Sequence, residues 1–217
     1  MVKINDSLSR ITKIQIYFMS MNKILRGLGV KLFLKKSRGL LFVGKRTHIT
    51  HKQYIEVGKN VKFEDLSEIQ GLSINNLQFG NNVTIGRNTQ IRPSSYYGVG
   101  EIGYGLKISD NSSIGPNSYV GCAGPINIGK NVMIGPNATL IAENHNFKEK
   151  SKSIKSQGVI HKGIHINDNV WIGSNVTILD GVTIGSGTVI AATSLVNKDI
   201  PQNTLYINKK NVYSKNI

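Results

Sequence analysis

The sequence has little cysteine, few aromatic residues and no long apolar run. Its 217 residues include one Cys, one Trp and 7% aromatic residues in all. A single cysteine, Cys122, excludes an internal disulfide framework, and a lone thiol is typical of the reducing cytoplasm. No stretch reaches the roughly 20 apolar residues that span a bilayer, and the N-terminus lacks the pattern of a signal peptide. We therefore expect a cytoplasmic protein whose core contains few large rings.

Acidic residues are also scarce, with 12 Asp and Glu against 27 Lys and Arg. The imbalance lies in residues 1–52, which contain 12 basic residues and one acid, Asp6. The rest of the chain contains 15 basic and 11 acidic residues and is nearly balanced. A basic face along a whole chain would indicate nucleic-acid binding, but this charge belongs to one segment without aromatic interleaving. We predict no nucleic-acid partner.

Residues 1–44 form this basic segment, in which we expect a helix followed by a strand at residues 40–43. Apolar residues recur there at steps of three or four, which is the spacing of one helix face. They are Ile4, Leu8, Ile11, Ile14, Phe18, Met21, Leu25 and Leu28. The helix could pack on the rest of the protein or on a partner subunit. Alternatively, residues 1–36 could bind the surface of an anionic membrane, where each basic side chain contributes about 1 kcal/mol. Both interpretations remain open.

From residue 57 onward the chain repeats every six residues. Thirteen units begin with an apolar residue, usually followed by Gly, and twelve of them have a small or β-branched residue four positions later, Leu106 being the exception. They begin at Val57, Phe79, Ile85, Ile102, Ile108, Ile114, Ile128, Ile134, Ile166, Ile172, Ile178, Ile184 and Ile190. The residue three positions after the first, which we call the corner position, is Asn in nine units, Gly in three and Thr in one. Asn and Gly tolerate the positive φ of a sharp corner, so the pattern predicts short parallel strands stacked coil on coil.

This pattern resembles the hexapeptide-repeat family, whose members form a left-handed parallel β-helix of triangular section. The resemblance covers residues 45–207 and implies an all-β fold with a short N-terminal helical segment, one extruded loop and a tail at 208–217. Most relatives are acyltransferases that use acetyl-CoA or an acyl carrier protein, usually as homotrimers. The handedness and the trimer are implied by the resemblance and do not follow from the periodicity.

The repeat is interrupted at residues 142–165, which include five Lys and almost no inward pattern. Such an extruded loop commonly carries function, and His145 stands at its start, where the preceding coil still fixes the backbone. An imidazole is suited to remove a hydroxyl proton at neutral pH, so His145 is the candidate general base. Glu143 could orient it or face water.

The strings NHNF and INDNVWIGSNVTILDGVTIG look closely like the O-acetyltransferases of capsular polysaccharide, lipopolysaccharide and colanic acid. The resemblance implies that His145 is the catalytic base and that Trp171 lines the acetyl-transfer site. It further implies that Ser174, Ala192 and Lys198 contact the acyl donor, acetyl-CoA. The family's usual Gly-x-Pro-Ala-Lys ending is missing from this sequence, which leaves open what contacts the nucleotide end of that donor.

Some hexapeptide-repeat proteins bind zinc through three histidines and hydrate carbon dioxide, a chemistry that needs convergent imidazoles. The remaining histidines are His48, His51, His161 and His165. No two of them lie on successive turns of the regular repeat, so we predict no metal.

The sequence therefore predicts an acetyl-CoA-dependent O-acetyltransferase that modifies a sugar hydroxyl of a bacterial surface polysaccharide or its precursor. N-acetylation of an amino or nucleotide sugar and acetylation of an antibiotic are alternatives. A non-catalytic repeat scaffold is an alternative of another class.

Overall fold

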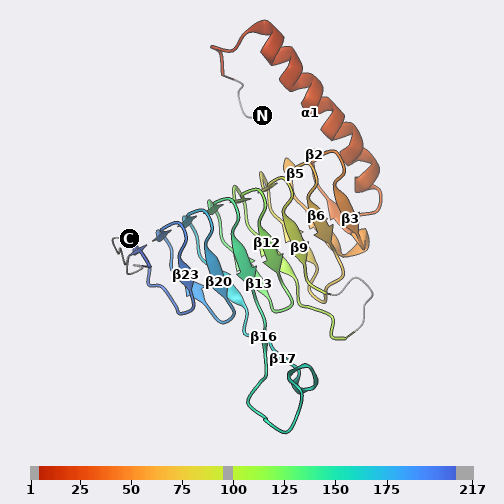
Figure 1. The fold of residues 1–217 in the computed structure, drawn as a ribbon. Coiled ribbons are helices and arrows are strands. Elements are labelled where there is room, and N and C mark those ends of the chain that lie inside the picture. The colour runs from red at the N-terminus through yellow and green to blue at the C-terminus, as the bar shows by residue number, and fades with distance from the viewer. Residues whose placement is uncertain (1–4, 95–99, 209–217) are drawn as a thin grey trace, which may run out of the picture.

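The computed structural model describes residues 5–94 and 100–208, and Figure 1 shows them as a helix joined to a long rod. Each turn of the rod adds one strand to each of three sheets in succession, and neighbouring strands of these sheets run parallel. We call the sheets first, second and third in chain order. The predicted parallel β-helix is confirmed.

The strands of all three sheets are two or three residues long. The first sheet contains, in chain order, β1 (Lys36–Ser37), β4 (Ile55–Val57), β7 (Leu77–Phe79), β10 (Leu106–Ile108), β13 (Ile126–Ile128), β18 (Ile164–Ile166) and β21 (Thr183–Ile184). The second contains β2 (Leu41–Val43), β5 (Val61–Phe63), β8 (Thr84–Ile85), β11 (Ser113–Ile114), β14 (Met133–Ile134), β19 (Trp171–Ile172), β22 (Val189–Ile190) and β24 (Leu205–Tyr206). The third contains β3 (His48–Thr50), β6 (Glu68–Gln70), β9 (Gln90–Arg92), β12 (Tyr119–Gly121), β15 (Thr139–Ile141), β20 (Thr177–Leu179) and β23 (Leu195–Val196).

The core is a column of aliphatic side chains enclosed by the three sheets. In-register pairing stacks like on like, so that Ile114 lies on Ile134 and Leu140 lies on Ile178. These side chains are at most 3% exposed. Burying one such side chain stabilises the fold by about 1.5–3 kcal/mol, and each coil achieves this burial only against its neighbours.

The residues three positions after the start of each unit have the positive φ that the sequence predicts for corners. All nine asparagines at that position have φ between +55° and +60°, and Thr193 has φ +62°. The side chains at this position also bond between coils: Asn82 Nδ2 donates to Asn111 Oδ1 at 2.9 Å, and Asn88 Nδ2 donates to Asn117 Oδ1 at 3.1 Å. Asparagine therefore provides both the left-handed corner and a polar ladder that joins the coils.

The structure differs from the sequence analysis at two points. The β-helix begins before residue 45, because β1 pairs with β4 and β2 pairs with β5. The unit assigned at Ile102 is wrong, since Ile102 lies in the connection that leads to β10 and the inward row resumes only at Leu106. Residues 1–4, which include Ile4, and 209–217 of the predicted tail lie outside the described residues.

The predicted N-terminal helix is present as α1 (Arg10–Lys31), with Ser9 as its N-cap. It continues through Gly27 and Gly29 because its C-terminal half is docked on β2. Arg26 Nε donates to the carbonyl of Val43 at 2.8 Å. Gly27 is buried there, and a Cβ on it would overlap the carbonyl oxygen of Leu41. Among the described residues, no helix is both long and apolar enough to cross a membrane.

The two helix glycines provide a matched test of this docking. A Cβ at Gly29 would meet nothing within 4 Å. We expect Gly27→Ala to lower the free energy of unfolding by about 1–3 kcal/mol through overpacking. Gly29→Ala should raise it by up to about 1 kcal/mol through better helix propensity. Urea unfolding followed by far-ultraviolet circular dichroism measures both, and equal effects would contradict the close contact.

Candidate functional site

The connections between strands differ widely in length at only one edge of the rod. Chain passing from the first to the second sheet, or from the second to the third, uses three or four residues. Connections from the third sheet to the first, along an edge that we call the loop edge, range from three residues (180–182) to 22 residues (142–163). The connections of this edge are residues 51–54, 71–76, 93–105, 122–125, 142–163 and 180–182. Loops of variable length on a rigid scaffold are the usual place for binding and catalytic groups.

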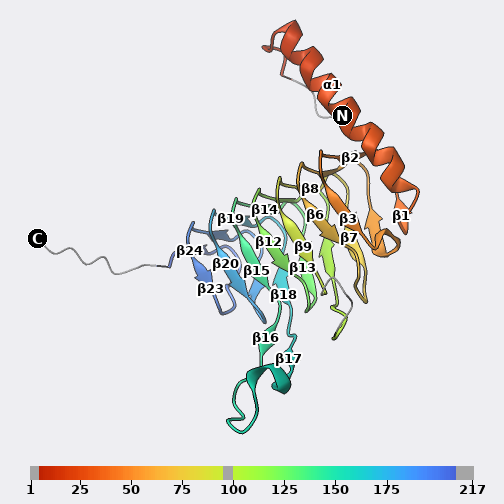
Figure 2. The same cartoon turned by 45° about the vertical axis from the view of Figure 1, so that its right-hand side comes forward.

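The longest loop-edge connection is a hairpin that projects from the rod (Figure 2). Its strands β16 (Asn144–His145) and β17 (Val159–Ile160) pair antiparallel, with His145 opposite Val159. The short 3₁₀ helix η2 (Ile154–Gln157) precedes β17, and Ser153 caps it. The sequence predicted the extrusion of this loop but not its strands, because two-residue strands leave no readable periodicity.

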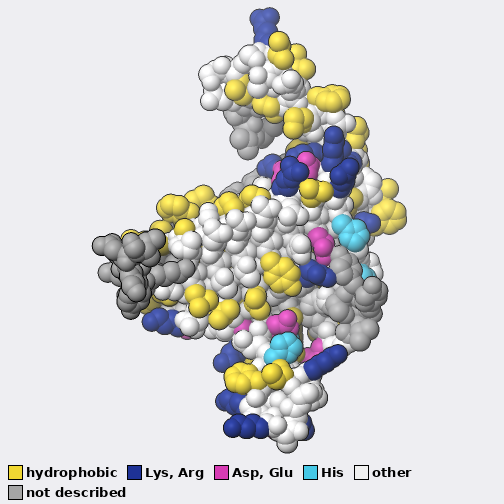
Figure 3. Space-filling view, viewed as in Figure 1, with side chains coloured by type: hydrophobic (Ala, Val, Ile, Leu, Met, Phe, Trp, Pro, Cys, Tyr) yellow, Lys and Arg dark blue, Asp and Glu magenta, His cyan; other side chains and the backbone are white. Residues whose placement is uncertain are grey.

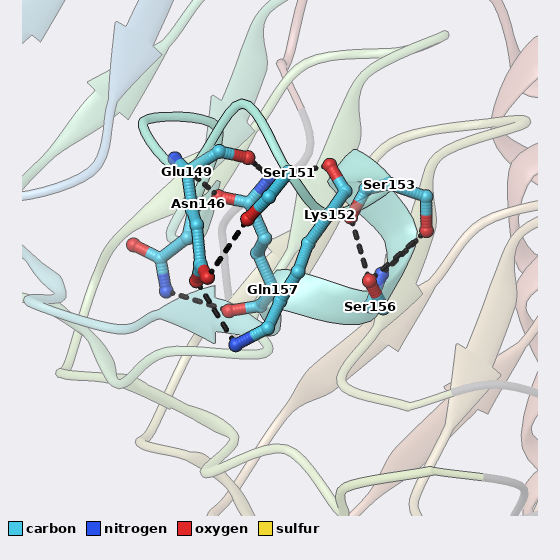
Figure 4. A network of polar contacts seen from close by, with 7 residues as sticks. All are labelled: Asn146, Glu149, Ser151, Lys152, Ser153, Ser156 and Gln157. Atoms are coloured by element: carbon cyan, nitrogen blue, oxygen red, sulfur yellow. Dashed lines mark hydrogen bonds and ion pairs between the residues drawn. The ribbon is translucent and has the colours of Figure 1, made fainter.

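Polar contacts brace the far part of this hairpin, as Figure 4 shows. Gln157 is the centre: its Oε1 accepts the backbone N–H of Glu149 at 3.0 Å, and its Nε2 donates to the carbonyls of Glu149 and Lys152. Asn146, the residue after His145, donates from Nδ2 to the carbonyl of Gln157 at 3.0 Å. The segment that follows His145 is therefore fixed to η2.

Asp180 anchors the base of the hairpin from the following coil. Its carboxylate accepts the backbone N–H of Gly163 at 2.7 Å and that of Lys162 at 3.0 Å. Asn144 Nδ2 also donates to Asp180 Oδ2, at 3.4 Å. The sequence analysis missed Asp180, because it lies in a regular repeat and its partners are far away in the sequence. Together with the Gln157 contacts, it holds both sides of His145.

The imidazole of His145 itself is exposed. Within residues 5–94 and 100–208, no side chain or backbone group forms a hydrogen bond or ion pair with it. Its ring nitrogens are therefore available to a bound molecule. Glu143 precedes it by two residues, but no contact in the described chain joins the two side chains.

Trp171 lies on the outer face of the second sheet, at the other side of the rod. It is 54% exposed and pairs in register with Met133 and Val189. Val189 pairs in turn with Leu205, and Met133 and Leu205 are 56% and 65% exposed. These four residues form an apolar row along the rod that no described residue covers.

Ser174 and Ala192 occupy equivalent positions at the edge between the second and third sheets. The backbone N–H of Thr193 donates to the carbonyl of Ser174 at 2.8 Å, which stacks the two corners. A Cβ on Gly173 would lie 2.6 Å from the nitrogen of Ala192, so the two coils are in close contact. The structure therefore brings Ser174 and Ala192 together, and Trp171 begins the strand that leads to this edge.

Lys198 lies elsewhere. It follows β23 of the third sheet and precedes Ile200, which pairs with Ile184 of the first sheet, so it belongs to the loop edge with His145. One copy of the chain thus separates the predicted residues into two groups at opposite edges of the third sheet. The first group is His145 and Lys198, and the second is Trp171, Ser174 and Ala192.

Two hollows on the rod lie away from both groups. One, of about 430 Å³, is lined by outer residues of the first sheet such as Glu56 and Lys107. The other, of about 180 Å³, includes His165. Neither includes any of the five predicted site residues.

The structure also bears on two other kinds of catalysis, by a cysteine nucleophile and by a bound metal ion. Cys122 is fully buried beside the core, and burial raises the pKa of its thiol well above the usual range, which disfavours a nucleophilic thiolate. In the described part of the chain, no three His, Cys, Asp or Glu side chains form a group that could hold a metal ion.

Two family models match the rod. "Bacterial transferase hexapeptide (six repeats)" matches residues 163–198, and "Hexapeptide repeat of succinyl-transferase" matches residues 105–140. A putative acetyltransferase of Schizosaccharomyces pombe is 49% identical over 84 residues, which are 38% of this chain and 39% of the relative. The galactoside O-acetyltransferase of Escherichia coli is 37% identical over 123 residues, 56% of this chain and 58% of the relative. The chain thus spans less than two thirds of these relatives.

Among solved structures, an N-acyltransferase from Bacillus cereus has a similar fold, with a TM-score of 0.52. It is 15% identical, and the match covers 82% of this chain and 80% of that chain. That structure is a complex with dTDP-4-amino-4,6-dideoxyglucose and coenzyme A. At this identity the likeness shows the fold, a left-handed β-helix, and nothing more.

Loss of the Asp180 carboxylate tests the anchoring of the hairpin. In Asp180→Ala we expect trypsin to cleave the exposed loop lysines, such as Lys152, several-fold faster than in the wild type. Asp168→Ala is the control, because Asp168 Oδ1 accepts the N–H of Lys130 in the same way at another edge. Cleavage is followed by mass spectrometry. Equal acceleration in both variants would indicate general loosening and contradict a local anchor.

Proposed function

We propose that this chain, whose residues 105–140 and 163–198 match hexapeptide-repeat transferase models, is an acetyl-CoA-dependent O-acetyltransferase of that family. Its proposed acceptor is a sugar hydroxyl of a bacterial surface polysaccharide or of a precursor. The observation that carries the proposal is the exposed imidazole of His145, held from both sides by a braced hairpin and free of partners in the described chain. The likeness to galactoside O-acetyltransferases supports a hydroxyl acceptor.

In the proposed reaction, His145 removes the proton from the acceptor hydroxyl as its oxygen attacks the acetyl carbonyl. The tetrahedral intermediate places a negative charge on the former carbonyl oxygen, which a backbone N–H beside the bound acetyl group would stabilise. The carbon–sulfur bond then breaks, and the coenzyme A sulfur leaves and receives the proton. The acetyl group passes directly to the sugar, and the buried Cys122 takes no part.

We further propose that the working enzyme is a homotrimer with its sites between copies. One chain places His145 and Trp171 at different edges, so a second copy is needed to bring the base to the acyl donor. The outer row of Met133, Trp171, Val189 and Leu205 offers apolar surface for that contact. Trp171, Ser174 and Ala192 of one copy would hold acetyl-CoA opposite His145 of the next. Lys198 would meet a phosphate of the donor.

A second candidate is N-acetylation of an amino sugar carried by a nucleotide. It is favoured by the fold shared with the N-acyltransferase that binds a dTDP-linked amino sugar. An amine acceptor would need the same loss of a proton during attack, so His145 would keep its role. Parallel assays with hydroxyl and amino sugars distinguish the two acceptors.

Because Cys122 is a free thiol, we propose that the reaction takes place in the cytoplasm.

Removal of the imidazole tests the base. We expect His145→Ala to lower the rate of acetyl transfer by about 10²–10⁴-fold, because the hydroxyl proton then has no positioned acceptor. Thiol release from acetyl-CoA is measured with galactosides and capsular oligosaccharides as acceptors. His165→Ala, an exposed histidine on the first sheet, should stay within a few-fold of wild type. A His145→Ala enzyme with near-wild-type turnover would contradict the assignment.

Mixed assemblies test whether two copies share a site. His145→Ala lacks the base, and Ala192→Arg places a bulky side chain at the exposed edge where the donor should lie. Each variant alone should be inactive. Trimers reassembled from both should regain part of the activity, because some sites would combine a normal His145 with a normal Ala192. Continued inactivity of verified mixed trimers would mean that both residues serve one site within a chain.

A further inference from the structure

The apolar stripe of α1 faces away from the rod. Its members within the helix are between 51% and 71% exposed. They are Ile11, Ile14, Phe18, Met21, Leu25 and Leu28. The stripe continues past the helix end into Leu32 and Phe33, which are 81% and 65% exposed. The helix does pack on the rest of the chain, which was one of the expectations, but it does so through another side than this stripe.

A different side of the helix holds it to the rod. Gly27 is the buried position of the helix. Lys23, four residues before Gly27 and on the same side of the helix, forms an ion pair with Glu64 of the rod. At about 100° per residue, Gly27 lies far around the helix from Phe18 and Leu25. These contacts, like that of Arg26, are in the C-terminal half of α1, and the N-terminal half extends beyond the rod (Figures 1 and 2). The docking thus fixes the stripe outward.

The charge of α1 indicates what kind of surface could cover the stripe. Its 22 residues include five basic side chains and no Asp or Glu. Two such helices packed side by side would repel each other, and the basic residues that follow the helix, Lys35, Lys36 and Arg38, add to the same field. An anionic surface would attract this whole end of the molecule. Figure 3 shows the apolar side chains along the helix and the basic cluster where it meets the rod.

We propose that α1 lies in the plane of an anionic phospholipid surface, with its outward stripe among the acyl chains and with Arg10 and Lys13, in the half of the helix that extends beyond the rod, at the headgroups. A helix with an apolar face, a basic remainder and no acid is the pattern of an interfacial helix. The rod would then extend from that surface at the end where β1 and β2 begin. This inference does not depend on the proposed activity, because it concerns binding alone.

Two adjacent exposed residues give a matched test on the full chain. Phe18 belongs to the stripe, whereas Met19 is 60% exposed and lies about 100° around the helix from it. The wild type should sediment with vesicles of phosphatidylcholine containing one third phosphatidylglycerol, and not with phosphatidylcholine alone. Phe18→Asp should reduce the bound fraction at least ten-fold, while Met19→Asp, with the same added charge, should reduce it less than two-fold. Raised salt should weaken wild-type binding.

The alternative occupant of the stripe is a second copy of this chain. If Phe18→Asp instead lowered the molecular mass measured by light scattering without lipid, the stripe would be a subunit contact and the proposal would fall. Equal loss of vesicle binding in both variants, or no binding by the wild type, would also overturn it. Ile14→Asp provides a second stripe variant, and unchanged circular dichroism confirms that each variant keeps its helix.

Discussion

The fold depends on a backbone that turns sharply from one sheet to the next. A left-handed residue stands at every turn from the first to the second sheet and from the second to the third, and most of these residues are asparagines, which adopt that conformation at small cost. With the corners fixed, successive coils stack in register and bury one aliphatic column. The result is a stiff scaffold, since each strand is held by neighbours on both sides. All other features of the molecule are attached to this scaffold.

Stiffness also explains where function can be placed. Two edges of the rod keep connections of three or four residues, so chain can be added only where the third sheet passes to the first. The hairpin of His145 is the longest of these additions, and it is braced by Gln157 within itself and by Asp180 from the next coil. The backbone of His145 is therefore fixed although its side chain is exposed. This combination of exposure and fixed position is what a base needs to meet a substrate that arrives from outside.

Two apolar surfaces are exposed to water in the single chain, at a cost in free energy. They are the row from Met133 to Leu205 on the rod and the stripe from Ile11 to Leu28 on α1. Their charges differ. The row lies on a nearly neutral rod, which suits contact with another copy, whereas the stripe belongs to a helix with only positive charge, which suits an anionic surface. The proposals for a trimer and for lipid binding rest on this difference.

The sequence by itself determined the coil, because the inward aliphatic residue, the corner asparagine and the small residue are local requirements repeated in phase. It also indicated His145, since a break in a regular period is visible without coordinates. Only the tertiary structure decided that Ile102 belongs to a connection, that Asp180 anchors a distant hairpin and that Ser174 meets Ala192 while Lys198 lies apart. The direction of the helix stripe was decided in the same way. Spacing shows that Phe18 and Leu25 share a face, but which face meets the rod depends on Gly27 fitting against Leu41, a contact between elements that periodicity does not encode.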